Sequence, residues 1–469
     1  MKIEDALKAG VTVLTTLGFL WVSLTARIQG QILGVVFLAL VVWSLYPKRH
    51  VESSILVLVL LSFFQASIGL EEFISSILST YGGSGFWIIV SGFILAKATE
   101  TSGLGRRIAL GITTSLGGKP GSIILSVAVA SLAVAPLSPS TTAKAFLLLP
   151  ICTGLVEAFN VEKGRSKYGA AVMLMSMAAN NIGSTAFLTA TVPNPISVQY
   201  IKEATGLDLD WLGWNGMALP LSLLLLAVCW LVCVRMFRPE VKETAESLER
   251  MKSLSDGLGP MNRAEKTVAV FFCSALLLWI TEGLHGLNSG LFSLGISLVL
   301  LMPKIGVIKI SGLAREVPWG SITLFAASMF LARAVGRWRA LDPVAQSVFN
   351  LINPSGVEPM LFVSLVVLVS MLLHVFFTST TVYATVMIPL VISLAQLQGI
   401  NPLMVALPVA FLTPVAVILP INTIPNIVFH STGYFTQKQM IAYGLIMSLL
   451  SVAIVLLFGL PYWGLLGLA

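Results

Sequence analysis

The chain has 469 residues, of which 56% are hydrophobic and 10% are charged, and its net charge is +7. Soluble domains carry about 25% charged residues, so this composition excludes an ordinary soluble protein and indicates a helical protein with many membrane spans. We interpret the excess of Lys and Arg as basic residues at cytoplasmic span ends, not as a nucleic-acid surface. The four cysteines fall in apolar runs without a CxxC pair, so we expect neither disulfides nor a metal site.

Apolar segments predict an all-α polytopic protein with about eleven transmembrane helices. Basic residues gather at alternate ends of these segments, which places the N-terminus, with Lys2 and Lys8, in the cytoplasm and the chain in the inner (plasma) membrane. A polar segment at 238–266 has charges of alternating sign and is expected to be a cytoplasmic linker. The expected spans are 10–27, 31–46, 52–70, 84–100, 168–192, 215–237, 267–284, 290–303, 318–336, 402–429 and 440–463.

A short polar phrase, Ser-Thr-Thr, occurs twice inside long apolar runs, and a proline follows each copy at the same spacing. A second phrase, Thr-x-Pro-Asn, follows later in each half, and residues 92–98 resemble residues 328–334. An internal repeat of this kind indicates one structural unit used twice. The repeated side chains are Ser140, Thr141, Thr142, Thr191, Pro193 and Asn194 in the first half, and Ser379, Thr380, Thr381, Thr423, Pro425 and Asn426 in the second.

Each Ser-Thr-Thr lies near the middle of a segment that we expect to be a re-entrant hairpin, 120–159 in the first half and 343–398 in the second. Basic residues flank both ends of the first segment, so two half-length helices around a polar tip fit it better than one span. The Thr-x-Pro-Asn phrases lie in segments expected to be broken helices, 168–194 and 402–429. Because matching spans run in opposite directions, the halves form an inverted repeat, which is the layout of secondary transporters.

The hairpin tips have the chemistry of an anion site. Serine and threonine are preferred N-caps, and the unpaired N–H groups and positive dipole end of a helix suit a carboxylate or sulfate oxygen. Two tips that enter from opposite sides therefore suit a molecule with two anionic ends. The alternative, that the hydroxyls only bond the preceding helical turn, accounts poorly for two matched copies.

Lys144 lies one helical turn after the first tip, and a cation at membrane depth is costly and usually functional. We interpret it as a fixed positive charge that attracts the anion or takes the place of a coupling cation; the second half has Tyr383 there. His374 and His430 are weaker candidates for a proton site. No catalytic motif is present, so we expect a protein that is not an enzyme. Candidate cation ligands in the broken helices are Asn181, Gly183 and Asn422.

In these phrases the chain resembles the divalent anion/sodium symporter family, whose members carry di- and tricarboxylates or sulfate. The resemblance covers nearly the whole chain. It implies a homodimer whose transport domain moves through the membrane as an elevator against a scaffold domain, with one substrate carboxylate at each tip. The implied scaffold comprises 1–104 and 267–340, the transport domain 105–237 and 341–469, and the linker 238–266.

The family reads Ser-Asn-Thr at both tips, whereas this chain has Thr141 and Thr380 in place of the asparagines. In sodium-coupled members those asparagines help to build the cation sites, so their absence argues against sodium coupling. The segment 138–144 resembles the exchanger branch, which includes citrate/succinate antiporters and 2-oxoglutarate/malate translocators and has arginine where Lys144 stands. The sequence therefore predicts an exchanger of small di- or tricarboxylates that needs no cofactor. A sodium- or proton-coupled symporter of the same anions or of sulfate, and an inorganic-ion antiporter, are the alternatives.

Overall fold

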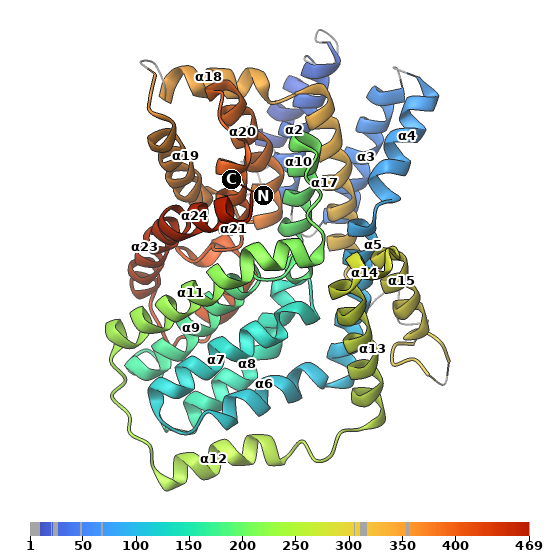
Figure 1. Cartoon of the computed structure of the whole chain (residues 1–469). Helices are drawn as coiled ribbons and strands as arrows, with labels where there is room; N and C mark the ends of the chain where they lie inside the picture. The colour runs from blue at the N-terminus through green and yellow to red at the C-terminus, as the bar shows by residue number, and fades with distance from the viewer. Residues whose placement is uncertain are drawn as a thin grey trace.

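The computed structural model describes residues 10–19, 21, 27–46, 49–66, 69–303, 305–309, 317–352 and 356–468. These residues form helices joined by turns, and none of them lies in a β-strand (Figure 1). Lys2, Lys8 and part of the first expected span, residues 20 and 22–26, lie outside the described residues. The cytoplasmic placement of the N-terminus therefore stays a prediction.

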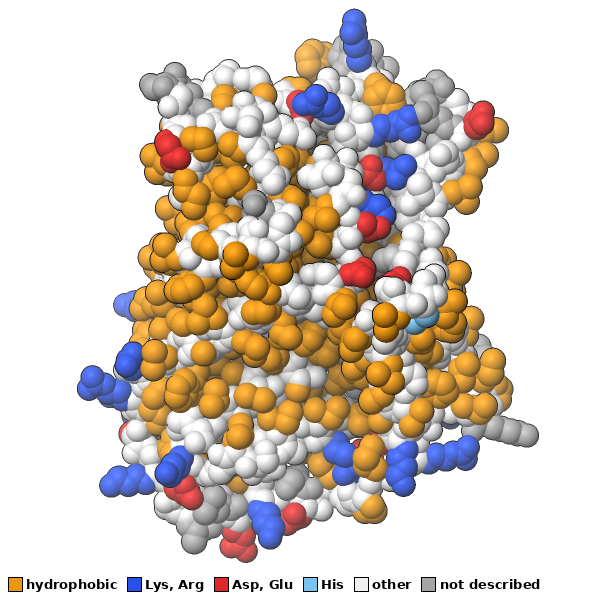
Figure 2. Space-filling view, viewed as in Figure 1, with side chains coloured by type: hydrophobic (Ala, Val, Ile, Leu, Met, Phe, Trp, Pro, Cys, Tyr) orange, Lys and Arg blue, Asp and Glu red, His pale blue; other side chains and the backbone are white. Residues whose placement is uncertain are grey.

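Seven of the described helical segments are long and apolar enough to cross a membrane, or eight if a pair bent by 51° at residues 82–83 is counted as one span. Figure 2 shows a broad apolar belt across the middle of the molecule, with charged side chains at its two ends and a further group of them on the right of the view, beside the upper part of the belt. The prediction of an all-helical, multi-span membrane protein is confirmed, whereas the number of spans stays a prediction. The seven segments are Ile28–Leu45, Pro120–Leu137, Trp211–Phe237, Trp319–Trp338, Pro359–Phe376, Thr380–Gln398 and Gln437–Leu465.

The first half places a helix at every expected span after residue 30 and adds two short helices, α4 and α6, that the sequence analysis did not separate. A helix at Gly10–Phe19 precedes them. The helices that follow Gly10–Phe19 in the first half are α2 (Ile28–Leu45), α3 (His50–Ala66), α4 (Leu70–Tyr81), α5 (Ser84–Ser102), α6 (Leu104–Ser115), α7 (Pro120–Val134), α8 (Thr141–Glu157), α9 (Lys167–Gly183), α10 (Pro193–Thr205) and α11 (Trp211–Phe237).

The second half repeats this order after the linker helix α12 (Ala245–Asp256). A π-helical turn, Val455–Gly459, joins its last two helices. The remaining helices are α13 (Arg263–Ile280), α14 (Glu282–His285), α15 (Ser289–Val299), α17 (Trp319–Trp338), α18 (Asp342–Ile352), α19 (Pro359–Leu373), α20 (Thr380–Gln398), α21 (Leu403–Leu412), α22 (Ile424–His430), α23 (Gln437–Ile454) and α24 (Leu460–Leu465).

The two helix pairs around the repeated phrase lie in opposite parts of the molecule. Figure 1 shows α7 and α8 in the lower half of the view, above α12, and α19 and α20 in the upper half, below α18. The halves interlock, because α10 packs on α20 and α22 packs on α8. This arrangement agrees with an inverted repeat whose hairpins enter from opposite sides.

The second helix pair begins later in the chain than the sequence indicated. Its first helix starts at Pro359, and Glu358 caps it by accepting a hydrogen bond from the Leu361 N–H at 2.9 Å. Proline suits the first position of a helix because its missing N–H would have no partner there. The expected segment 343–398 therefore contains a separate helix, α18, in which Ala345 alone is buried, followed by a hairpin at 359–398.

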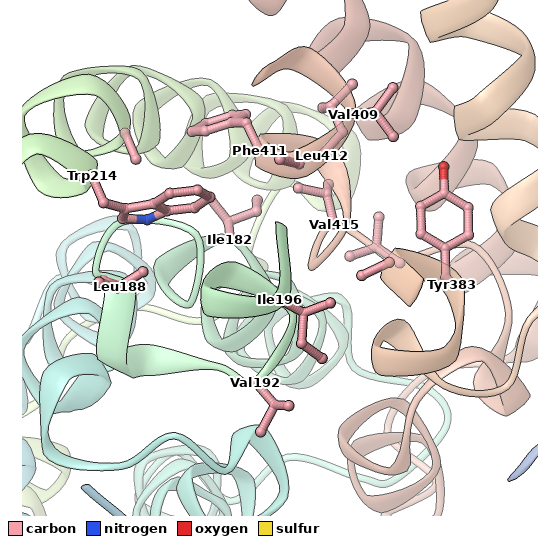
Figure 3. Packing of buried hydrophobic residues seen from close by; sticks show 14 of the residues in the cluster. Ile182, Leu188, Val192, Ile196, Trp214, Tyr383, Val409, Phe411, Leu412 and Val415 are labelled. Carbon is pink, nitrogen blue, oxygen red and sulfur yellow. The ribbon is translucent and has the colours of Figure 1, made fainter. Parts of the chain in front are cut away.

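A shared apolar core joins the halves around α9, whose residues from Tyr168 to Gly183 are all buried. Figure 3 shows part of this core, with Ile182 and Trp214 from the first half near Phe411 from the second. Because α9 is buried on every side and carries two asparagines, it is surrounded by protein. The first broken helix thus begins inside the molecule, whereas the second exposes Ile421, Ile424 and Ile427.

The linker is attached at both of its ends. Near its start, Glu240 accepts hydrogen bonds from Ser166 Oγ at 2.6 Å and from the Tyr168 N–H at 2.9 Å, at the first turn of α9. Near its end, Arg107 on α6 donates to both carboxylate oxygens of Glu265, at 2.8 and 3.0 Å. These hydrogen bonds lower the pKa of Glu265.

Candidate functional site

The first tip is a helix start inside the protein. Helix α7 ends in a 3₁₀ turn, Ala135–Leu137, and α8 begins at Thr141 with Ser140 as its N-cap. Ser140 Oγ accepts from the Ala143 N–H at 3.2 Å, and Ser138 Oγ accepts from the Ser140 N–H at 3.1 Å. The N-cap role predicted for the phrase is present, so the positive end of α8 points to this tip.

The second tip has the same local structure. Helix α19 ends in the 3₁₀ turn His374–Phe376, and α20 begins at Thr380 with Ser379 as its N-cap. Ser379 Oγ accepts from the Val382 N–H at 3.5 Å, which is a longer bond than its counterpart in the first half. Thr380 is half-buried and Thr381 is buried.

The asparagines of the two Thr-x-Pro-Asn phrases make matching hydrogen bonds. Asn194 Nδ2 donates to the carbonyls of Ser184 and Phe187, both at 2.9 Å. Asn426 Nδ2 donates to the carbonyls of Ala416 and Leu419, at 2.7 and 2.9 Å. The bonded residues have the same spacing along the chain in both halves. Each asparagine therefore satisfies backbone carbonyls that the break in its helix leaves without partners.

Both prolines of these phrases lie at helix starts, and one of the two threonines is an N-cap. Pro193 is the first residue of α10, and Pro425 lies in the first turn of α22. Thr423 caps α22 by accepting from the Asn426 N–H at 3.3 Å, whereas Thr191 lies buried before α10. Local helix geometry alone therefore explains why the Thr-x-Pro-Asn phrase occurs in both halves. A role of these residues in substrate binding stays a prediction.

Two neighbouring asparagines of α9 connect the first tip to the second half. Asn180 Nδ2 donates to the Thr141 carbonyl at 3.0 Å. Asn181 Nδ2 donates to Asn426 Oδ1 at 3.0 Å and to the Ala416 carbonyl at 3.3 Å. Sequence analysis selected Asn181 and did not select Asn180, although their adjacency in an apolar helix was the available signal.

Asn422 connects a broken helix to the second tip, as Asn180 does at the first. Its Nδ2 donates to the carbonyls of His374, Val375 and Phe377, at 3.3, 3.0 and 3.1 Å. Its Oδ1 accepts from the Leu419 N–H at 2.9 Å. The broken helix of the second half is thus tied directly to its hairpin, and these carbonyls are engaged by an N–H donor.

Lys144 is buried, with 2% of its surface exposed. Its Nζ donates to Ser184 Oγ and to the Ala190 carbonyl, both at 2.7 Å, so the ammonium lies against the first broken helix. Within the described part of the chain no carboxylate forms an ion pair with it. The site therefore holds a lysine whose partners are two neutral oxygens, and sequence analysis missed Ser184 as one of them.

The second half places an aromatic pair at the matching position. Tyr383 donates from its hydroxyl to the Ser370 carbonyl at 2.8 Å, and its ring lies 4.1 Å from that of His374. His374 Nε2 lies 2.8 Å from the Thr413 carbonyl. His430 lies at the end of α22, with its ring 5.5 Å from Phe435. Both histidines pack in the fold, and a proton role for either stays a prediction.

A cavity of about 800 Å³ opens beside the first tip, between α5, α6 and α8. Ser140, Thr142 and Lys144 line it, whereas no residue of the second Ser-Thr-Thr does. Gly183 does not line it, and a Cβ at that position would lie in ordinary van der Waals contact with the backbone of Leu132 on α7, at 3.5 Å. The cavity also has charged groups that the sequence analysis did not assign to the site: Lys97, Glu100 and Arg106.

Comparison with known proteins gives relatives along almost the whole chain. The family model of the sodium:sulfate symporter transmembrane region matches residues 7–469. A membrane protein of Cupriavidus necator is 25% identical over 454 residues, covering 94% of this chain and 88% of that protein. The sodium-dependent dicarboxylate transporter SdcS of Staphylococcus saprophyticus is 27% identical over 399 residues, covering 80% of this chain and 76% of that protein.

Among solved structures, the chain is similar to the YdaH transporter of Alcanivorax borkumensis, with a TM-score of 0.57 over 89% of this chain and 98% of that one. The two are 16% identical, so this likeness supports the fold alone. The family match, in contrast, extends over both hairpins and both broken helices. The chain therefore belongs to the sodium:sulfate symporter family, the divalent anion/sodium symporters, and is a membrane transporter and not an enzyme.

Proposed function

We propose that this transporter exchanges small dicarboxylates or tricarboxylates, of the succinate, malate, 2-oxoglutarate and citrate class, across the membrane. The dicarboxylate class is taken from relatives that are named sodium-dependent dicarboxylate transporters. It is supported by the capped helix start at Ser140, whose N–H groups suit a carboxylate. Thr142 and Lys144 line the same cavity and would add a hydroxyl and a positive charge.

The observation that carries exchange is the position of Lys144. Its ammonium is bound to the protein at Ser184 and Ala190, so this positive charge cannot leave with the substrate. A moving domain without its anion would carry an uncompensated buried charge through the membrane, which is costly. The domain then crosses the membrane more easily with an anion bound than without one, in either direction. An anion must therefore bind on each side before the domain moves, and this condition produces exchange.

The second tip supports the same proposal. The Asn422 amide lies within hydrogen-bond distance of the carbonyls of His374, Val375 and Phe377. A sodium ion bound by these oxygens would compete with that N–H donor for their lone pairs. The sequence-based expectation that sodium coupling is absent is therefore kept, although the staphylococcal relatives are named sodium-dependent.

The wider arrangement belongs to the same proposal. The transport domain would comprise 105–237 and 341–469, the scaffold 1–104 and 267–340, and the protein would act as a homodimer in the cell membrane. The domain with both hairpins would move as an elevator. The linker is attached at both ends to helices of the proposed transport domain, to α9 through Glu240 and to α6 through Glu265.

Counterflow in proteoliposomes tests the proposal. We expect labelled succinate to enter vesicles loaded with unlabelled dicarboxylate, and to stay outside empty vesicles, at equal rates with and without sodium. Uptake into empty vesicles that follows a sodium or proton gradient would instead establish a symporter. Thermal stabilisation of the purified protein by sodium alone, with no effect of succinate, malate, 2-oxoglutarate, citrate or sulfate, would favour an inorganic-ion antiporter.

A further inference from the structure

Two basic residues occupy matching positions in the repeat and have different surroundings. Lys97 on α5 and Arg333 on α17 are equivalent in the matched segments 92–98 and 328–334. Lys97 lines the large cavity and pairs with Glu100 of its own helix at 3.3 Å. Arg333 pairs instead with Glu203, which lies on α10, at 2.9 Å.

The Arg333–Glu203 pair lies in a close helix contact. The exposed fractions of the Arg333 and Glu203 side chains are 25% and 20%, and that of Lys97 is 18%, so Arg333 differs from Lys97 in its contact with α10 and not in its exposure. Gln199 Nε2 also donates to Glu203 Oε1, at 2.7 Å. A methyl group at Gly336, one turn along α17, would lie 3.2 Å from Glu203 Cβ. Charge and shape therefore hold α10 against α17 at the same place.

The neighbouring alanines show how differently the two matching regions are covered. Ala96, beside Lys97, is half-buried and lines the cavity. Ala332, its equivalent beside Arg333, is fully buried. One of the two repeat-related helices thus faces the cavity of about 800 Å³ at this level. The other packs against α10, where only a smaller pocket of about 290 Å³, lined by Glu203 and Gly336, remains among the pockets found in the described residues. Inverted repeats produce two access states when the halves exchange these conformations.

We propose that the Arg333–Glu203 pair is a latch specific to the conformation in which the cavity is open at the first tip. In the opposite conformation α10 separates from α17, Arg333 faces the open side as Lys97 does here, and the region around Lys97 closes. Breaking a shielded ion pair by removing one charge leaves the other charge without its partner, which destabilises the closed contact. The inference does not depend on which solute is transported.

Cysteine reactivity tests the latch without any substrate. Cys273 is exposed and the other three cysteines are buried, so Cys273→Ser is a suitable background. Ala96→Cys and Ala332→Cys then report on the two matching positions through their rates of reaction with a maleimide in detergent. We expect Glu203→Gln to shift the equilibrium by about tenfold, so that Ala332→Cys reacts faster and Ala96→Cys reacts more slowly.

The opposite signs separate a change of conformation from a loss of structure. Asp208→Asn is the matched control, because it removes the exposed Lys202–Asp208 pair beside the same end of α10 and should change neither rate. The exchanged pair Arg333→Glu with Glu203→Arg should restore both rates toward those of the parent. Unchanged rates in Glu203→Gln, or faster reaction at both positions, would contradict a state-specific latch.

Discussion

The first and second halves build one framework and complete it with different side chains. In both halves an asparagine, Asn194 or Asn426, donates to two carbonyls at the break in a helix. In the first half Lys144 reaches from the hairpin to the Ala190 carbonyl of the broken helix. In the second half Asn422, at the position equivalent to Ala190, reaches from the broken helix to the hairpin.

This comparison separates the need for a hydrogen-bond donor at each helix break from the choice between a charged and a neutral donor. Backbone carbonyls buried at a helix break need donors, because an unsatisfied buried polar group is costly. The first half meets the requirement with a charged donor and the second half with a neutral one. The repeat therefore determines where donors are needed, whereas the individual side chain determines whether a fixed charge accompanies them.

Removing the charged donor should have the largest effect. We expect Lys144→Ala to lower succinate counterflow by roughly 100-fold, because hydrogen bonds to a charged group contribute up to about 3 kcal/mol and each 1.4 kcal/mol is a factor of ten. Tyr383→Phe, at the matching position, loses only a neutral hydrogen bond to Ser370 and should keep most of its counterflow. Normal exchange by Lys144→Ala would show that this lysine has a structural role alone.

Removing the neutral donor, Asn422, should lower the stability of the fold more than it lowers transport. Asn422→Ala removes the side-chain donor from three carbonyls of the second tip, of which only that of His374 keeps another donor, the Phe377 N–H. We expect the free energy of unfolding to fall by roughly 3 kcal/mol. Thermal unfolding in detergent measures the change. Asn401→Ala is the control, because that side chain accepts only from the Leu403 N–H at a turn and should cost about 1 kcal/mol. Equal losses in both variants would refute the special role of Asn422.

The tips themselves can be compared through their threonines. Thr142→Ala should weaken succinate binding by about tenfold and Thr381→Ala by less, as expected for one lost hydrogen bond at most, with little effect on folding. Thr142 lines the cavity and Thr381 is 9% exposed, so the larger effect is expected at Thr142. Titration calorimetry supplies both affinities. Unchanged affinity in both variants would refute the assignment of the tips to substrate.

The smallest expected difference concerns the turns that follow α5 and α17. Gly103 has φ +83° and its equivalent, Arg339, has φ +49°, so both are left-handed. Gly103→Ala should cost about 1 kcal/mol, because a Cβ is unfavourable in that region. Arg339→Gly removes the same strain and also an exposed pair with Asp342, so its melting temperature should stay close to that of the parent. A clear loss of stability in Arg339→Gly would show that the ion pair outweighs the strain.

Features that depend on neighbouring residues were predictable from the sequence. Long apolar runs require a membrane environment, and each expected span after residue 30 corresponds to a helix or to a broken pair of helices. The N-cap roles of Ser140 and Ser379 depend on a donor three residues away, so the phrase itself indicates them. The repeat was visible because both halves retain the same polar residues at the same spacing.

Only the tertiary structure decided which groups meet. Lys144 finds Ser184 and Ala190 because α8 packs on α9, and no local pattern contains that contact. The same holds for the link from Asn181 to Asn426 in the other half. The cavity beside the first tip and the contact of Arg333 with Glu203 on α10 are likewise set by how distant helices pack. The matched segments 92–98 and 328–334 are similar in sequence, so the different partners of Lys97 and Arg333 come from packing and not from the residues alone.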